Sequence, residues 1–194
     1  MRENKPCLEM YEWDQIWWEH TENLDAPRAL YIGDSISCGT RPQLNRLAEG
    51  KLLFDHYGSS KALDNPHLQP SVLAFTAQQH RLDMILFNNG LHGWHLEDET
   101  AYAKYYEEML LFFREQFPRV PVYLLLSTPS REAHKDARIR LRNGVVRNLA
   151  QKYGLPVIDL YRIADTLRDT FADTVHLQES GYQKLAEEIL KHIL

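Results

Sequence analysis

Residues 29–37 read Ala-Leu-Tyr-Ile-Gly-Asp-Ser-Ile-Ser, an apolar run that ends in Gly33-Asp34-Ser35. An apolar run without polar alternation is typical of a strand buried on both faces of a parallel sheet. The residues that follow, Ser37–Glu49, have helical periodicity. This stretch therefore predicts a first strand, a tight turn that carries Ser35, and a helix.

The same alternation continues to the end of the chain. Further apolar runs have the length of strands, and longer segments have helical periodicity. The runs are Leu52–Phe54, Met84–Phe87, Val120–Leu126 and Val157–Leu160, and the helical segments are Thr100–Phe117, Arg131–Tyr153 and Glu179–Leu194. A β-α order repeated about five times predicts a three-layer α/β/α sandwich, flavodoxin-like, with about five parallel strands.

The 194 residues contain no internal repeat, low-complexity tract or linker, which favours a single domain over residues 1–194. Before the first strand, Trp13, Trp17 and their apolar neighbours in Glu12–His20 recur at helical spacing. We therefore expect residues 1–26 to form a helical extension that packs on the domain. Trp17 and Trp18 are expected to belong to the core rather than to a ligand site.

The composition narrows the classes of partner. A net charge of -5 and a pI near 6.0 argue against nucleic acid or an anionic membrane as the main partner, and leave neutral or modestly polar small molecules. Cys7 and Cys38 have neither metal-ligand spacing nor a disulfide framework. Residues 1–6 lack the apolar core of a signal peptide and no apolar run has transmembrane length, so we expect a soluble, cytoplasmic protein.

A second motif, Asp173-Thr174-Val175-His176, lies just before the last predicted helix. A serine hydroxyl is a poor nucleophile at neutral pH and needs a base within hydrogen-bond reach. His176 is the natural base, and Asp173 can hold one ring nitrogen while the other faces Ser35. Because sites in parallel α/β sheets lie beyond the carboxyl ends of the strands, these residues are expected to converge. Together they predict a serine hydrolase.

Each motif also has a plainer interpretation. Gly33-Asp34-Ser35 alone is more often a turn in which serine caps a helix, and Asp173-x-x-His176 alone is an exposed loop. Cys38, three residues after Ser35, is a rival nucleophile without a base-bearing motif, and we expect it to be a small buried residue. The basic residues Arg138, Arg140, Arg142 and Arg147 are expected to form a solvated helix face, although Arg131 or Arg142 has the length to reach the site.

Gly33-Asp34-Ser35 and Asp173-x-x-His176 resemble the first and last sequence blocks of the SGNH (GDSL-like) hydrolases. The third block of that family, Gly-x-Asn-Asp, is similar to residues 86–89, Leu-Phe-Asn-Asn. The resemblance implies an oxyanion hole built from the backbone N–H groups of Ser35 and Gly58 and the side-chain amide of Asn88. Asn89 is the alternative amide, and Lys61–Asp64 is the alternative segment for the second-block N–H.

His92, Trp94 and His95 follow the third block and, with Asp34 and Ser127, are expected to line the substrate site. His92 and His95 with Glu97 lack a convincing further metal ligand. Since Ser35, His176 and Asp173 include their own base, no metal or cofactor is expected. An indole beside imidazoles suits a sugar ring.

The leading function is therefore hydrolysis of short-chain acyl esters, above all O-acetyl groups, with carbohydrates as the leading alcohol. The alternatives are a lipase or lysophospholipase, an acyltransferase with the same triad, and a non-catalytic module that binds a small molecule or carbohydrate. A flavodoxin-like nucleotide binder lacks the glycine loop that cradles phosphate. The oligomeric state stays open.

Overall fold

The computed structural model describes residues 8–194, which form one six-stranded sheet in the order β1-β3-β2-β4-β5-β6. The strands from β3 to β6 in this order pair in parallel, and β1 pairs antiparallel with β3 at the edge. Without β1, this is the strand order of a flavodoxin-like doubly wound sheet. The strands are β1 Asp14–Trp17, β2 Arg28–Gly33, β3 Leu53–Ser59, β4 Met84–Phe87, β5 Val122–Leu125 and β6 Val157–Ile158.

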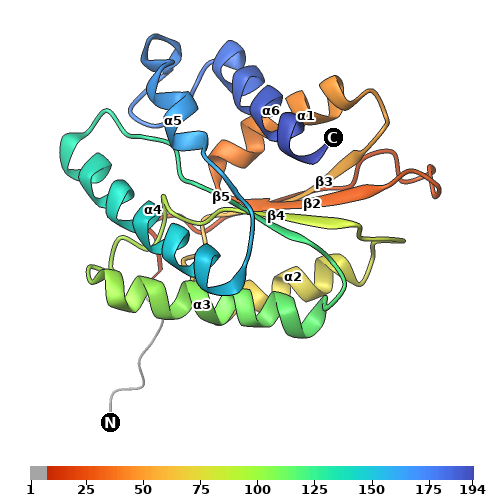
Figure 1. Cartoon of the computed structure of the whole chain (residues 1–194), viewed down its shortest axis with the longest axis horizontal. Helices are drawn as coiled ribbons and strands as arrows, with labels where there is room; N and C mark the ends of the chain where they lie inside the picture. Colours follow the sequence, from red (N-terminus) through yellow and green to blue (C-terminus); the bar gives the residue numbers. More distant parts are fainter. Residues whose placement is uncertain (1–7) are drawn as a thin grey trace.

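Helices cover both faces of the sheet (Figure 1). The layer of α1, α5 and α6 packs on one face, and α2, α3 and α4 lie on the other. The predicted three-layer α/β/α sandwich is thus confirmed. The helices are α1 Ser35–Ala48, α2 Leu68–Thr76, α3 Glu99–Gln116, α4 Ala133–Tyr153, α5 Leu160–Asp165 and α6 Glu179–Ile193, with a short 3-10 helix at Arg168–Thr170.

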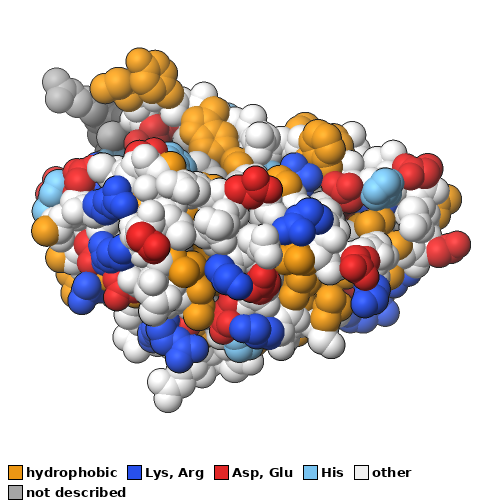
Figure 2. Space-filling model, turned by 90° about the horizontal axis from the view of Figure 1, so that it is seen from above, with side chains coloured by type: hydrophobic (Ala, Val, Ile, Leu, Met, Phe, Trp, Pro, Cys, Tyr) orange, Lys and Arg blue, Asp and Glu red, His pale blue; other side chains and the backbone are white. Residues whose placement is uncertain are grey.

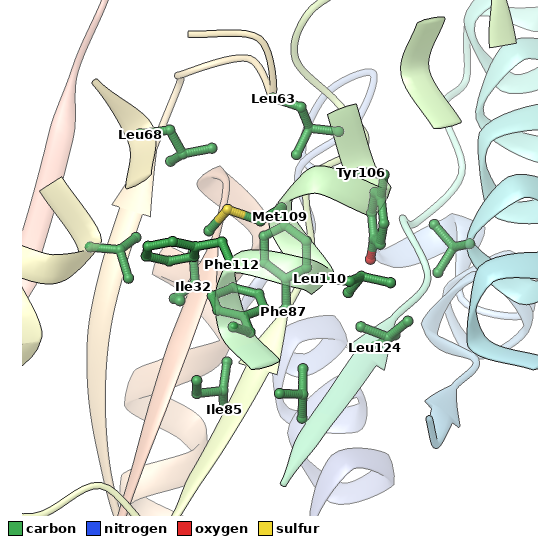
Figure 3. Packing of buried hydrophobic residues seen from close by; sticks show 14 of the residues in the cluster. Ile32, Leu63, Leu68, Ile85, Phe87, Tyr106, Met109, Leu110, Phe112 and Leu124 are labelled. Atoms are coloured by element: carbon green, nitrogen blue, oxygen red, sulfur yellow. The ribbon is translucent and has the colours of Figure 1, made fainter. Parts of the chain in front are cut away.

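Alternate residues of each central strand pack against the two helix layers, one on each face of the sheet. In β2, Leu30 and Ile32 join the hydrophobic cluster under α3, while Ala29 and Tyr31 join the cluster under α1 and α6. Figure 3 shows the first cluster, where side chains of the sheet such as Phe87 meet those of α3. Burial on both faces explains why the strands read as continuous apolar runs in the sequence.

The N-terminal segment differs from its prediction. Residues 14–17 form an edge strand with Asp14 opposite Ser59 and Trp17 opposite His56, so the helix expected over Glu12–His20 is wrong. Aromatic and β-branched residues favour strands, and the free edge of β3 supplies hydrogen-bond partners that outweigh the helical spacing. Residues 1–7 of the expected extension, including Cys7, lie outside the described residues.

The tryptophans of this segment have different environments. Trp18 stacks on Phe75 at 4.6 Å between ring centroids and packs against the core, as expected. Trp17 is 49% exposed and lies against the guanidinium of Arg41, so its assignment to the core is wrong.

The surface seen in Figure 2 carries Lys and Arg side chains interspersed with Asp and Glu. No helix within residues 8–194 combines the length and the apolar composition of a membrane span.

Candidate active site

The turn after β2 presents Ser35 at the carboxyl end of a central strand, where α1 begins. Asp34 caps the helix, because its Oδ1 accepts a hydrogen bond from the Ile36 N–H at 2.9 Å. A Cβ at Gly33 would lie 2.7 Å from the Ser37 Cβ, so the tight turn needs glycine there. Asp34 is only 1% exposed, which makes it a support of the turn rather than the substrate-lining residue that we expected.

The second motif lies at the tip of a short hairpin. Phe171 and Leu177 pair as an isolated antiparallel bridge, and the Ala172 N–H donates to the His176 carbonyl at 2.8 Å. The Arg131 N–H donates to the Thr174 carbonyl, also at 2.8 Å, and so anchors this hairpin to the loop after β5. The tip is therefore held in place from a neighbouring strand end.

This arrangement brings Ser35, His176 and Asp173 together. His176 Nε2 lies 2.8 Å from the Ser35 Oγ, and His176 Nδ1 lies 2.7 Å from the Asp173 Oδ2. Each ring nitrogen thus has its own partner, which is the geometry of a serine nucleophile, an imidazole base and an orienting carboxylate. Ser35 is partly exposed, so its hydroxyl is reachable from solvent.

The second oxygen of the Asp173 carboxylate binds the backbone. Its Oδ1 accepts from the N–H groups of Val175 at 2.9 Å and His176 at 2.8 Å. Burial opposes the charge, but these two hydrogen bonds and the His176 ring together lower the pKa of Asp173 to about 2. Asp173 is therefore an anion at neutral pH and orients the imidazole.

The two candidate asparagines face different neighbours. Asn88 Nδ2 donates to the Leu125 carbonyl at 2.9 Å and lies 3.1 Å from the Ser127 Oγ, on the β5 side. Asn89 Nδ2 donates to the Lys61 carbonyl at 2.9 Å. Since Lys61 follows β3 and Asn89 follows β4, this contact crosses the end of β2, where Ser35 lies. The Asn88 amide is thus engaged on the β5 side, and the Asn89 amide on the β3 side.

Gly58 lies within β3, between β1 and β2. The Ser60 N–H donates to the Trp13 carbonyl, and hydrogen-bonded pairs alternate along an antiparallel ladder. The Gly58 N–H therefore points to its partner Gln15 and not to Ser35, so the Gly58 assignment is wrong. The following loop, Lys61–Asp64, is the segment whose amides lie beyond the strand end.

The residues after the third block form a packed wall. His92 Nδ1 lies 3.7 Å from a Glu9 oxygen, and His95 Nε2 lies 2.9 Å from an Asp64 oxygen. Both histidines are partly exposed. Within residues 8–194, no three His, Cys, Asp or Glu side chains converge as metal ligands would.

Trp94 and Ser127 both pack against other protein groups. The Trp94 ring lies against the guanidinium of Arg142, 4.8 Å from its centroid, and packs on the core. Ser127 is 5% exposed, and a Cβ at Gly90 would lie 1.8 Å from its Oγ. Ser127 is therefore buried against this loop, and Trp94 packs on the core with part of its side chain exposed.

Arg142 differs from the solvated position expected of the basic run on α4. Its side chain is buried at 1% exposure, between the rings of Trp94 and Tyr102. It donates to the carbonyls of Gly90 at 3.0 Å, His92 at 2.6 Å and Gly93 at 2.6 Å. The expected solvated face of α4 is wrong at this position, although Arg140 and Arg147 are exposed. Its length, noted from the sequence, carries the guanidinium to the loop after β4.

Cys38 is free and half-buried. Burial, with a smaller effect of the Asp34 charge, raises the pKa of its thiol to about 12. Because the thiolate is the reactive form, Cys38 is not a competing nucleophile at neutral pH.

Comparison with known proteins finds similarity in structure only. No family model and no curated protein matches this chain. Solved structures do match. A member of the lipolytic protein G-D-S-L family from Veillonella parvula DSM 2008 is 19% identical with a TM-score of 0.69, covering 87% of this chain and 98% of that one. The acetyl xylan esterase AlAXEase is 17% identical with a TM-score of 0.67, covering 86% and 100%.

A carbohydrate esterase family 3 protein from Talaromyces cellulolyticus is 20% identical with a TM-score of 0.67, covering 87% of this chain and 96% of that one. At these identities the likeness is one of fold, and it extends over nearly the whole length of each neighbour. The chain therefore has the fold of the SGNH, or GDSL-like, hydrolases.

Proposed function

We propose that this protein is a serine esterase that hydrolyses short-chain acyl esters, above all O-acetyl groups on carbohydrates. The observation that carries the proposal is the pair of contacts made by His176, 2.8 Å to the Ser35 Oγ and 2.7 Å to the Asp173 Oδ2. A loop histidine without a catalytic role is not expected to bind both a serine at a helix start, as His176 binds Ser35, and a carboxylate of its own hairpin, as it binds Asp173. The assembled triad also weighs against a non-catalytic binding module.

The chemistry follows from these positions. Ser35 attacks the ester carbonyl while His176 takes its proton, and the Asp173 carboxylate stabilises the imidazolium that forms. The oxyanion accepts hydrogen bonds from the Ser35 N–H at the start of α1 and from the Asn89 amide. Losing one such donor costs about 2.7–4 kcal/mol of transition-state stabilisation. His176 then protonates the leaving alcohol, and water hydrolyses the acyl-serine by the same route.

Two observations support the substrate class. The wall beside the triad is polar, with His92 held by Glu9 and His95 by Asp64. Two of the neighbours in structure are an acetyl xylan esterase and a carbohydrate esterase. A polar wall suits a hydroxylated alcohol better than a long alkyl chain. Transfer of the acyl group to a sugar with the same triad is the second candidate.

The test is esterase activity of the wild type and Ser35→Ala against p-nitrophenyl acetate, butyrate and octanoate, then against acetylated sugars. We expect acetate to be cleaved best and Ser35→Ala to lose at least about three orders of magnitude in kcat. Circular dichroism should show the same fold in both proteins, since only one partly exposed hydroxyl is removed. Turnover by Ser35→Ala above a few per cent of wild type would refute the nucleophile, and a preference for octanoate would favour a lipase.

A further inference from the structure

The segment Glu9–Trp13, which precedes the edge strand, is attached to the loops on both sides of the nucleophile. At one end, the Trp13 N–H donates to the Ser60 Oγ at 2.9 Å, and the Ser60 N–H donates to the Trp13 carbonyl at 3.1 Å. Ser60 directly follows β3. This end of the segment is therefore fixed to the end of the strand next to β2.

At the other end, a single carboxylate serves two groups. Glu9 Oε1 accepts the Gly93 N–H at 2.8 Å and lies 3.7 Å from His92 Nδ1. The Trp13 ring also approaches His92 edge-on, at 6.1 Å between centroids. His92 and Gly93 belong to the loop after β4, the strand on the other side of β2.

The segment thus passes over the end of β2, where Ser35 lies. Neighbouring strands are about 4.8 Å apart, and Trp13 continues the line of β1 outside β3, so about 14 Å separates it from β4. The four steps from residue 9 to residue 13 span up to about 14 Å of extended chain, and the Glu9 side chain extends the reach to Gly93. In agreement with this placement, burial raises the pKa of Asp34 while the charges of His92 and His176 oppose the rise, as expected of imidazoles close to the Ser35 turn.

Exposure along the segment is the reverse of the usual pattern. Leu8 and Met10 are 60% and 87% exposed, whereas the Glu9 side chain is only 25% exposed. Figure 2 shows hydrophobic side chains standing out beside the grey N-terminal residues. Burying an unpaired charge is costly, so a carboxylate is buried beside exposed apolar residues only where it has polar partners. For Glu9 these partners are the Gly93 N–H and the His92 ring.

We propose that Glu9 is a positioning residue of the active site, which holds the loop Gly90–Gly93 beside Ser35 through the Gly93 N–H and the His92 ring. This inference rests on the proposed esterase function. The carbonyls of the same loop are held from the opposite side by Arg142. The loop directly follows Asn89, so its position sets the placement of the oxyanion amide. Glu9 thereby acts on turnover through the loop and does not touch the reacting atoms.

The experiment compares Glu9→Ala and Glu9→Gln with a matched control. Glu22→Ala removes another glutamate that contacts a histidine, His20 at 3.0 Å, on the exposed loop before β2. For p-nitrophenyl acetate, Glu9→Ala should lower kcat about ten-fold, the scale of a lost hydrogen bond to a charged group, with little change in KM. Glu9→Gln keeps an oxygen that accepts the Gly93 N–H and should recover most of the loss, while Glu22→Ala should match wild type.

Thermal unfolding midpoints separate positioning from stability. The inference predicts that Glu9→Ala loses turnover at temperatures where it is fully folded. It is overturned if Glu9→Ala keeps wild-type kcat, or if Glu9→Gln loses as much as Glu9→Ala. Failure of the esterase function is distinct from both, since it would appear as activity that survives Ser35→Ala.

Discussion

Beneath Ser35, a buried pair of side chains holds the turn. The Ser37 hydroxyl donates to the Asp34 carbonyl at 2.6 Å and lies 2.7 Å from His56 Nε2. A Cβ at Gly58 would lie 2.5 Å from the His56 ring, so Gly58 makes room for this histidine. His56 is fully buried, and burial, with a smaller effect of the Arg41 charge, lowers its pKa from 6.5 to about 3.

This histidine should make stability depend on pH. The folded state keeps the His56 ring neutral down to about pH 3, whereas the unfolded chain takes up a proton below its ordinary pKa of 6.5. The unfolded state binds more protons in this window, so stability falls as the pH falls from 6.5 towards 3. Urea unfolding at several pH values should show a slope of at most about 1.4 kcal/mol per pH unit from this group. His56→Gln, which does not titrate, should flatten it, and an unchanged slope would contradict the assignment.

The triad should act as a unit. Ser35→Ala and His176→Ala are each expected to lower kcat by several orders of magnitude, and the double variant should be barely worse than either. Asp173→Asn should lose less, because the base and the nucleophile remain but the imidazole loses its anionic partner. Steady-state kinetics on p-nitrophenyl acetate measure all four variants. Additive losses of Ser35→Ala and His176→Ala would mean that His176 acts elsewhere.

At the scale of elements, α4 holds the loop that follows β4. Arg142 binds three carbonyls of that loop, and Asn143 brackets the backbone of Ser127, accepting its N–H and donating to its carbonyl, both at 2.9 Å. One helix thus fixes the loops after two neighbouring strands, β4 and β5. The backbone groups that Arg142 and Asn143 bind in the wall beside Ser35 are thus satisfied from the core side.

Arg142→Met tests this support. The substitution fills much of the same volume but leaves buried carbonyls without a donor, so we expect a loss of about 2–4 kcal/mol in unfolding free energy and a reduced kcat. Arg147→Met on the same helix removes only an exposed ion pair with Asp159 and should cost less than about 1 kcal/mol. Urea unfolding and esterase assays measure both. Equal losses of unfolding free energy and kcat in the two variants would show that Arg142 does not hold the loop after β4.

At the scale of the whole molecule, the two hydrophobic clusters share their strands. In β4, Ile85 and Phe87 face one cluster and Leu86 faces the other, so the loss of either helix layer exposes an apolar face of strands that both layers share. We therefore expect cooperative unfolding in urea. Tryptophan fluorescence, which reports mainly on the β1 region through Trp13, Trp17 and Trp18, should change together with far-ultraviolet circular dichroism. A fluorescence change at lower urea concentration would show that β1 detaches first.

Much of this architecture is visible in the sequence because it depends on local patterns. Apolar runs locate the central strands, and Met84–Phe87 has the predicted bounds, although β3 continues five residues beyond the predicted Leu52–Phe54. The long helices follow from their periodicity. The edge strand at Asp14–Trp17 was missed because its partner lies some 40 residues away in β3, and a free strand edge cannot be recognised locally. Helix α2, Leu68–Thr76, was also missed, since it is short and largely apolar.

The sequence by itself determined the strand and helix order, the turn that presents Ser35, and the spacing of Asp173 and His176, because each of these is a property of consecutive residues. Tertiary structure alone decided which way side chains and amides face. It turns Gly58 into the sheet, Asn88 towards β5 and Asn89 across β2, and it buries Arg142. These outcomes depend on which segment, distant in the sequence, packs against each residue. Because buried polar groups need hydrogen-bond partners, each group binds the donors and acceptors of that segment.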